Sequence, residues 1–329
     1  MSLEDDIMGK AIELGFDAVG ITDASPIDAG QVELLSAWLK AGYAGQMKYM
    51  HRNFEKRINP AKLLENAQSV IVVGLSYKPP KQPPRQAEAA RPTGRPAIAW
   101  AGRIAEYAQY EDYHPFMKKR LGKLADFVTS IAGEDVRSKI CVDSAPLAER
   151  SVALRAGLGF IGKNHTLIHP VLGPQIFLGE IVTTLRLRPD TPSGGNCAAC
   201  NRCMDACPTG VLRGDGQFDA NKCISYLTIE CKGPIGAERA ERMGDRLFGC
   251  DECVLACPVQ KDAPACKNKE LKFYPDRAGL DLDEVLSLTD ETFSTKFAGS
   301  PIGRTGLERL ERNAQICAAN AGDARGKRQ

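Results

Sequence analysis

The sequence predicts an α/β domain, then a cysteine-rich module, and then a short helical C-terminal segment. Helical and strand-like apolar patterns alternate from Leu3 to about Leu185, which is typical of an α/β domain. Most of the 12 cysteines in the 329-residue chain fall between Cys197 and Cys257, where apolar periodicity is weak. Apolar residues return to helical spacing after Leu280. We therefore expect three units, at residues 1–188, 189–270 and 271–329.

The composition is that of an ordinary globular protein, with 43% hydrophobic and 26% charged residues and a net charge of +2. A nucleic-acid partner would therefore be held by local basic patches rather than by a general field. The N-terminus is acidic and does not resemble a signal peptide, and no apolar run approaches the ~18 residues that span a bilayer. We expect a cytoplasmic monomer without a membrane partner.

The first unit begins with Ile7, Ala11 and Leu14 at helical spacing. Strands are predicted at 18–22, 69–75, 139–143 and 175–184, and helices near 28–40, 114–131 and 146–156. Residues 78–96 contain six prolines and five basic residues and predict a long loop, either a solvated insertion or a phosphate contact.

Asp143 stands where a predicted strand gives way to a predicted helix, with Pro146 in the first turn of that helix. Either Asp143 or Ser144 could be a helix N-cap. Alternatively, the Asp143 carboxyl could face a ligand, because α/β sheets commonly bind ligands at the carboxyl ends of their strands. The residues themselves leave both interpretations open.

The glycines of Gly157–Asn164 fit two nucleotide-binding patterns, but their context does not. They follow a predicted helix rather than a strand, and Asn164 replaces the Ser or Thr that would meet magnesium. A tight turn after the helix is the better interpretation.

The first cysteine run has the full spacing of bacterial ferredoxins, Cys-x2-Cys-x2-Cys-x3-Cys-Pro. In that pattern the fourth cysteine ligates the other cluster. The second run lacks its first cysteine, because Leu247 stands in that place. The pattern therefore predicts two 4Fe–4S clusters, the first held by Cys197, Cys200, Cys203 and Cys257, and the second by Cys207, Cys250, Cys253 and one more cysteine.

Cys223 and Cys231 are the two candidates for the missing ligand, and we favour Cys223. Zinc knuckles are the alternative use of such cysteine pairs, although two Cys-Pro endings favour iron–sulfur clusters. Two clusters imply single-electron transfer, and a pure electron carrier would have no use for the large preceding domain. We expect that domain to receive the electrons.

The chain resembles the epoxyqueuosine reductase family over nearly its whole length. The resemblance rests on Arg57–Leu64, Asp112-Tyr-His114, Val142-Asp-Ser-Ala-Pro146, Arg155–Asn164, Phe177-Leu-Gly-Glu180, both cysteine runs, Lys222–Glu230, Gly249-Cys-Asp-Glu-Cys253 and Phe297-Ala-Gly-Ser-Pro301. The chain departs from the family at Tyr110-Glu111, where a Gly-Arg pair is usual, and at Val259, where tryptophan is usual.

The resemblance implies a cobalamin cofactor between the α/β domain and the cluster module, with Cys223 as the missing ligand. The Asp-x-His pattern that supplies a histidine to cobalt is incomplete, since Met117 takes its glycine position, so the cobalamin would be base-off. The residues implied for the cobalamin pocket are Arg57, Asp112, His114, Asp143, Lys163, Asn164, Ser225 and Asp251. Arg57 or the Asp143 region would lie nearest the substrate.

The implied reaction reduces epoxyqueuosine to queuosine at the wobble position of tRNA, with an unidentified electron donor. The clusters would reduce the cobalt, the cobalt would attack an epoxide carbon, and Asp143 would protonate the departing oxygen. Asp143 would then need a raised pKa, which we expect burial to supply. Lys232, Arg304, Arg309 and Arg312 are candidate phosphate contacts, although Arg309 and Arg312 could instead be exposed arginines paired with Glu308 or Glu311.

The same residues are compatible with two alternative functions. A related corrinoid and iron–sulfur reductase would share the modules but act on a small molecule without binding tRNA. A ferredoxin-like carrier would bind no cobalamin at all.

Overall fold

The computed structural model describes residues 2–80 and 100–326, so most of the loop predicted at 78–96 lies outside the described residues. The main sheet has four strands in the order β1-β2-β7-β4, and all three pairings are antiparallel. Its strands are β1 (Ala18–Asp23), β2 (Ser69–Ser76), β7 (Ile176–Thr183) and β4 (Ser138–Cys141). The alternation of helices and strands is therefore confirmed, but it does not build parallel β-α-β units.

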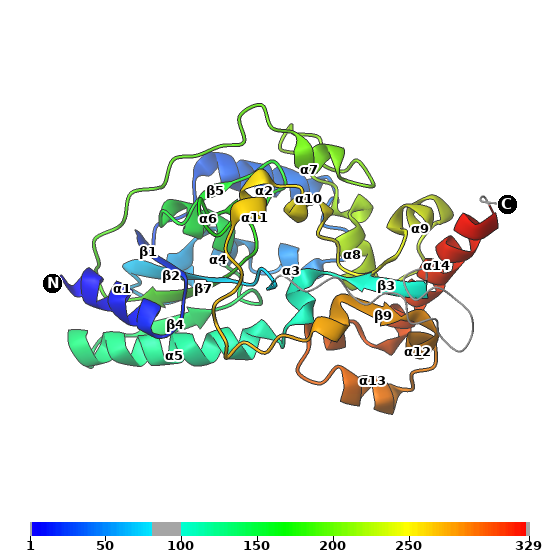
Figure 1. The fold of residues 1–329 in the computed structure, drawn as a ribbon. Coiled ribbons are helices and arrows are strands. Elements are labelled where there is room, and N and C mark those ends of the chain that lie inside the picture. Colours follow the sequence, from blue (N-terminus) through cyan, green and yellow to red (C-terminus); the bar gives the residue numbers. More distant parts are fainter. Residues whose placement is uncertain (1, 81–99, 327–329) are drawn as a thin grey trace.

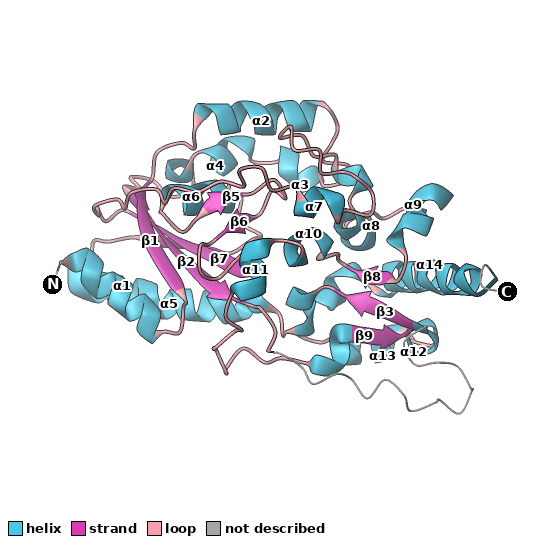
Figure 2. Ribbon diagram, turned by 45° about the horizontal axis from the view of Figure 1, so that its top comes forward, coloured by secondary structure: helices cyan, strands magenta, loops and turns pink. Residues whose placement is uncertain are grey.

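Helices cover both faces of this sheet (Figures 1 and 2). Alternate residues of β2 explain why, since Ile71, Val73 and Leu75 face one core while Val70 and Val72 face another. The first core is completed by α1 (Leu3–Glu13) and α5 (Tyr113–Ala132), and the second by α6 (Glu149–Arg155) and part of α2 (Ala29–Lys40). Helix α6 begins at Glu149, three residues later than the predicted 146.

A second sheet of three short strands has the order β8-β3-β9. β3 (Ala101–Ile104) runs parallel to β8 (Arg246–Phe248) and antiparallel to β9 (Gly279–Asp281). None of these three strands is predicted from the sequence, because each is too short to show periodicity and its partners are distant in sequence. The strands come from all three predicted units, and the division at residues 188 and 270 stays a prediction.

The remaining elements are mostly short. Two-residue strands β5 (Phe160–Ile161) and β6 (Leu167–Ile168) form a small hairpin. The other helices are α3 (Lys48–His51), α4 (Phe54–Ile58), α7 (Arg202–Asp205), α8 (Ile224–Ile229), α9 (Ala237–Met243), α10 (Glu252–Leu255), α11 (Pro258–Asp262), α12 (Leu282–Leu286), α13 (Asp290–Lys296) and α14 (Leu307–Gly326). Single-turn 3-10 helices occur at Pro60–Lys62, Glu106–Gln109, Ala220–Lys222, Pro275–Ala278 and Pro301–Thr305.

Two arginines of the C-terminal helix α14 donate hydrogen bonds to main-chain carbonyls at the end of α8. Arg312 donates from Nη1 to the carbonyl oxygens of Cys231 and Gly233 (2.8 and 2.7 Å) and from Nη2 to that of Leu227 (2.8 Å). Arg309 donates to the carbonyl oxygen of Ile229. Both arginines therefore satisfy main-chain carbonyls at the C-terminal end of α8. The predicted surface pairs with Glu308 or Glu311 are therefore wrong within the described residues, while phosphate contacts of Arg309 and Arg312 stay a prediction.

Arg312→Ala is expected to destabilise the protein by about 2–4 kcal/mol, because several half-buried carbonyls lose a charged donor. Arg242→Ala is the matched control, since Arg242 pairs with Glu238 on the exposed surface of α9. Its expected effect is about 0.5 kcal/mol or less. Urea unfolding of the two variants measures both changes in the free energy of unfolding. Equal losses of stability would show that the Arg312 hydrogen bonds contribute no more than a surface ion pair.

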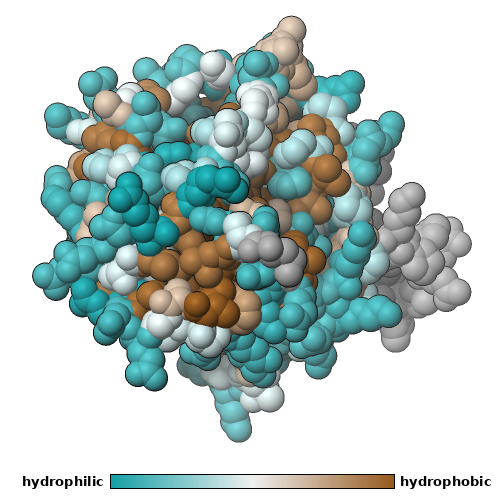
Figure 3. Space-filling model, turned by 90° about the vertical axis from the view of Figure 1, so that its left-hand side faces the viewer, coloured by the Kyte–Doolittle hydropathy of each residue, from teal (hydrophilic) through white to brown (hydrophobic). Residues whose placement is uncertain are grey.

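On the side of the molecule that carries α1, hydrophilic residues surround an apolar area (Figure 3). Ile12 on α1 and Ile131 on α5 are large apolar side chains that are exposed to solvent. Such exposure is ordinary in folded proteins. Within residues 2–80 and 100–326, no helix combines the length and the apolar character needed to cross a membrane.

Candidate active site

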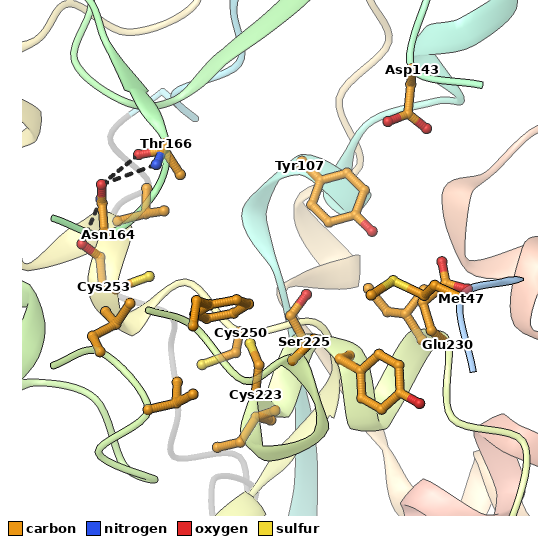
Figure 4. A pocket seen from close by; sticks show the side chains of 18 of the residues that line it. Met47, Tyr107, Asp143, Asn164, Thr166, Cys223, Ser225, Glu230, Cys250 and Cys253 are labelled. Carbon is orange, nitrogen blue, oxygen red and sulfur yellow. Dashed lines mark hydrogen bonds between the residues drawn. The ribbon is translucent and has the colours of Figure 1, made fainter. Parts of the chain in front are cut away.

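A large cavity of about 810 Å³ lies between the cysteine-rich region and the turn that follows β4. One end is lined by cysteines and the other by Asp143, Arg57 and Arg304. Figure 4 shows Asp143 across the cavity from Cys223, Cys250 and Cys253, with the Tyr107 ring projecting into the space between them. A ligand in this cavity could therefore touch the cysteine end and the Asp143 end together.

Four cysteines line this cavity, namely Cys207, Cys223, Cys250 and Cys253. They are the set assigned to the second cluster once Cys223 is chosen. Burial and the neighbouring thiols Cys223, Cys250 and Cys207 raise the pKa of Cys253, so the four sulfurs influence one another. Cys231 does not line the cavity, and its sulfur faces the carbonyl of Gly233 at 3.9 Å.

A smaller cavity of about 100 Å³ is lined by Cys197, Cys200, Cys203 and Cys257, the set assigned to the first cluster. Among the described residues, no group of three or more His, Cys, Asp or Glu side chains could hold a single metal ion. The cysteines instead surround cavities. Asn164 lines both cavities and donates from Nδ2 to the Cys253 carbonyl (3.3 Å), so it lies between the two sets.

Lys163, which was predicted for the cofactor pocket, lies at the first cysteine run instead. Its main-chain N–H donates to the sulfur of Cys197 (3.4 Å). Its ammonium donates to the carbonyls of Ala198 and Cys200 (both 3.1 Å) and to Asn201 Oδ1 (2.9 Å). The turn that resembles a nucleotide-binding loop therefore supports a cluster loop, and it follows α6 as the sequence predicted.

Asp143 occupies the strained turn between β4 and α6. Its φ of 49° lies in the left-handed region, which residues other than glycine seldom adopt. The N-cap interpretation is wrong for both candidates, because α6 begins at Glu149, its N-cap is Ala148, and no side chain of the described residues caps it. The turn leaves the Asp143 carboxylate 45% exposed at the cavity.

His114 connects two carboxylates. Its Nδ1 lies 2.7 Å from Asp112 Oδ1, and its Nε2 lies 3.1 Å from Asp143 Oδ2. Asp112 is also the N-cap of α5 and accepts the His114 main-chain N–H, so the start of α5 orients the ring. Burial lowers the pKa of His114, but the bonds to Asp112 and Asp143 outweigh it and raise the pKa to about 9. His114 is therefore a cation at neutral pH.

The pKa of Asp143 shifts in the direction opposite to the one expected from the sequence. Burial raises it, but the hydrogen bond and charge of His114 and the charges of Arg304 and Arg57 outweigh burial and lower the pKa. Arg304 Nη1 lies 3.7 Å from Asp143 Oδ2. The resting pair is therefore a carboxylate and an imidazolium, with the exchangeable proton on His114.

We expect His114 to titrate near pH 9, which NMR of the imidazole nitrogens against pH would measure. Because its folded pKa is raised from 6.5, its contribution to the free energy of unfolding is complete below about pH 6.5 and is lost as pH rises through about 9. The shift corresponds to at most about 3 kcal/mol. Asp112→Asn should lower the His114 pKa, whereas a titration near 6.5 in the unmodified protein would contradict the imidazolium.

The other predicted pocket residues divide into two groups. Arg57, Asn164 and Ser225 line the large cavity, and the buried Nε of Arg57 has no hydrogen-bond partner among the described residues. Asp112 and Asp251 do not line it. Asp251 instead accepts the main-chain N–H of Glu106 (2.5 Å) and so fixes the turn that carries Tyr107.

Several lining residues carried no signal in the sequence. Met47 and Tyr49 come from α3 and its start, Tyr107 from a 3-10 turn, and Glu230 from the end of α8. Tyr113 could have been suspected, because it lies inside the Asp-Tyr-His motif, and its ring stacks on Phe177 at 4.1 Å. These residues come together only in the folded chain, so no local spacing in the sequence predicts that they line one cavity.

Two family models match the chain. Residues 57–144 match the one described as "Epoxyqueuosine reductase QueG, DUF1730", and residues 196–260 match the "4Fe-4S double cluster binding domain". The match to the second model covers all eight cysteines that line the two cavities.

Known relatives extend these matches to nearly the whole chain. An epoxyqueuosine reductase of Vibrio cholerae is 37% identical over 97% of this chain and 84% of its own length. A solved epoxyqueuosine reductase with an epoxyqueuosine-modified tRNA-Tyr stem loop superposes with a TM-score of 0.87 at 32% identity, covering 98% of this chain and 82% of that one. A reductase of Bacillus subtilis whose catalytic aspartate loop is swung out of its active site gives 0.86 at 31% identity, with the same coverage. This chain therefore belongs to the epoxyqueuosine reductase family.

Proposed function

We propose that this protein reduces epoxyqueuosine to queuosine in tRNA, using two 4Fe–4S clusters and cobalamin. The observation that carries the proposal is the single cavity that joins four cysteines to Asp143. The reaction consumes two electrons and two protons, removes the epoxide oxygen as water and leaves an alkene. A protein for this reaction needs an electron path, a reducing centre and a proton source that meet at one site.

The two cysteine sets supply the electron path. The cysteines assigned to the first cluster, which include Cys257, line the small cavity. Those assigned to the second cluster, which include Cys223, line the large cavity. Asn164 lies between them. Electrons would therefore enter through the first cluster and leave through the second, one at a time. The N–H that Lys163 donates to Cys197 would stabilise the more reduced, more negative state of the first cluster.

The large cavity fits cobalamin, which the family resemblance implies. Its walls between Cys223 and Asp143 include apolar and aromatic side chains, which suit the face of a large ring. It also presents the buried Nε of Arg57, which has no hydrogen-bond partner within the described part of the chain. Arg57, Asn164 and Ser225 would hold the cofactor. When bound, cobalamin supplies a cobalt centre that takes electrons from the clusters and reduces the substrate carbon.

Asp143 and His114 would supply protons to the departing oxygen. His114 holds a proton on Nε2 against Asp143 Oδ2, and of these two residues Asp143 lines the cavity. A substrate oxygen that becomes negative beside Asp143 favours passage of this proton from His114 through Asp143. Asp112 keeps the imidazole oriented throughout, because it holds Nδ1.

Cations near the cavity would meet the phosphates of the anticodon loop. Lys232 is exposed and follows α8, and Arg304 lines the cavity mouth with half of its side chain exposed. Arg304 also faces Asp143, so its replacement would disturb the proton source as well as RNA binding. Lys232 is therefore the cleaner probe of a phosphate contact.

We expect tRNA affinity to fall steeply with salt, because bound phosphates release counterions. Lys232→Ala should lower the slope of log affinity against log salt by up to about one unit. Lys10→Ala is the control, since Lys10 lies on α1 and pairs with Glu13. A slope that does not respond to Lys232 would remove this residue from the RNA contact, and a flat salt dependence would count against RNA altogether.

The decisive experiment is nucleoside analysis of epoxyqueuosine-containing tRNA after incubation with the cluster-loaded protein, cobalamin and a chemical reductant. Appearance of queuosine supports the proposal. Unchanged tRNA together with a cobalamin-dependent visible spectrum would favour a corrinoid reductase of small molecules. A spectrum that cobalamin does not alter would favour an electron carrier.

A further inference from the structure

Glu180 is a carboxyl group buried in the middle of the main sheet. It lies on β7, opposite Val72 of β2 and Cys141 of β4, and has no exposed surface. Neither of its oxygens has a hydrogen-bond partner among the described residues. Burial, Glu149 and Asp143 all raise the pKa of Glu180 well above its usual value. An unpaired carboxylate is strongly disfavoured in such a place, so Glu180 is a neutral acid.

Glu149 is the first residue of α6, and its charge is the largest contribution from a neighbouring acid to the raised pKa of Glu180. Helix α6 packs against β7, and a proton on Glu180 that is donated to Glu149 lowers the pKa of Glu149 and raises that of Glu180. Burial and the charge of Asp143 raise the pKa of Glu149 to about 7. Glu149 is therefore the member of the pair that carries charge.

Glu149 also reaches the proposed proton donor. Its Oε1 accepts the main-chain N–H of Asp143. That contact fixes the residue whose φ is 49°, a conformation that an aspartate keeps only when its surroundings hold it. The Asp143 turn is thus held from two sides, by Glu149 at the main chain and by His114 at the carboxylate.

We propose that Glu149 and Glu180 share one proton, and that this buried acid pair positions Asp143 at the cavity. The inference rests on the proposed role of Asp143. Glu180 donates the shared proton to Glu149 and so holds its carboxylate in place. Glu149 in turn accepts the main-chain N–H of Asp143. Two carboxyl groups in contact cannot both ionise in an apolar site, so the pair keeps one proton at neutral pH.

Other ionisable groups face the pair from every side, and they fix the expected pH dependence. They are Asp143, Arg150, Arg57, Tyr113 and Cys141. Burial and the two glutamates raise the pKa of Cys141 to about 12, so its thiol adds no charge at neutral pH. When Glu149 itself takes a proton below about pH 7, it becomes a weaker acceptor for the Asp143 N–H, and the turn loosens.

Infrared spectroscopy of the cluster-loaded protein tests the shared proton without any turnover. At pH 7 we expect a buried carboxylic-acid band that shifts in D₂O and disappears in Glu180→Gln. Asp143→Asn is the control and should keep the band, because Asp143 is ionised. A Glu180→Gln spectrum that retains the band overturns the shared proton.

Hydrogen–deuterium exchange of the peptide that contains Asp143 tests the positioning. Glu149→Ala should speed exchange at this amide by about tenfold, as expected for loss of one hydrogen bond. Glu149→Gln should restore slow exchange, because its amide oxygen still accepts the N–H. Unchanged exchange in Glu149→Ala overturns the positioning role. Both measurements are made without tRNA, so their failure is distinguishable from failure of the proposed function.

The pH profile of turnover supplies the last readout. We expect an acid limb near pH 7 in the unmodified protein and its loss in Glu149→Gln, which cannot take up the proton. Glu180→Leu removes the donor that stabilises ionised Glu149, so the limb should move to higher pH. A limb that stays in place in both variants overturns the proposal.

Discussion

Cys223→Ala is expected to lose one of the two clusters, while Cys231→Ala keeps both. Iron should fall from about eight atoms per chain to about four in the first variant, because a 4Fe–4S cluster rarely survives without its fourth thiolate. Cys223 lines the cavity with Cys207, Cys250 and Cys253, and α8 begins directly after it. Cys231 lies at the far end of the same helix, beyond the cavity.

Iron and sulfide analysis with electron paramagnetic resonance of the reduced protein measures this difference. Cys231→Ala is a matched control, because both cysteines are partly buried and flank one short helix. Equal iron loss in both variants would break the assignment. Zinc in place of iron and sulfide would instead end the redox proposal.

The cysteine sets could be grouped from the sequence because their spacing is set by one local chemistry. Crossed ligation in ferredoxin-type runs placed Cys257 with the first run, and the structure gathers these four cysteines around one cavity. Spacing alone left Cys223 and Cys231 open, since neither belongs to a run. The family resemblance favoured Cys223, and its place in the large cavity supports that choice.

Features that depend on distant contacts could not be predicted in the same way. The pairing of β3 with β8 joins segments about 140 residues apart in sequence. The direction of the Asp143 pKa shift depends on His114, Arg57 and Arg304, which come from three separate parts of the chain. The sequence identified the carboxyl group but not the cations that surround it.

Helix-boundary errors had a similar origin. Pro146 suggested an early helix start, but the chain first makes the strained turn at Asp143 and begins α6 only at Glu149. That delay frees the Asp143 side chain from capping and leaves it at the cavity. The local rule failed at a site where the structure keeps a strained residue for a proposed chemical role, as is common at functional sites.

Asp143→Asn is expected to lower turnover by roughly 10²-fold or more while the fold and both clusters survive, because a positioned proton donor is worth about that much. Asparagine has nearly the same shape and tolerates the left-handed region well, so the turn with φ of 49° should persist. It carries no charge, so the His114 pKa should fall from about 9 toward its usual value. Nucleoside analysis of tRNA measures the turnover, and NMR measures the titration.

Ser144→Ala is the control for this variant. Ser144 is the next residue, lines the same cavity, and donates from Oγ to the carbonyl of Val142 (3.2 Å). Its loss should leave the His114 titration unchanged, because no charge is removed. An Asp143→Asn protein that is folded, loaded with cofactor and shifted in its His114 titration, yet converts epoxyqueuosine at a near-normal rate, would remove Asp143 from proton transfer. The proton would then have to reach the substrate from His114 or water directly, and the strained turn at Asp143 would need another explanation.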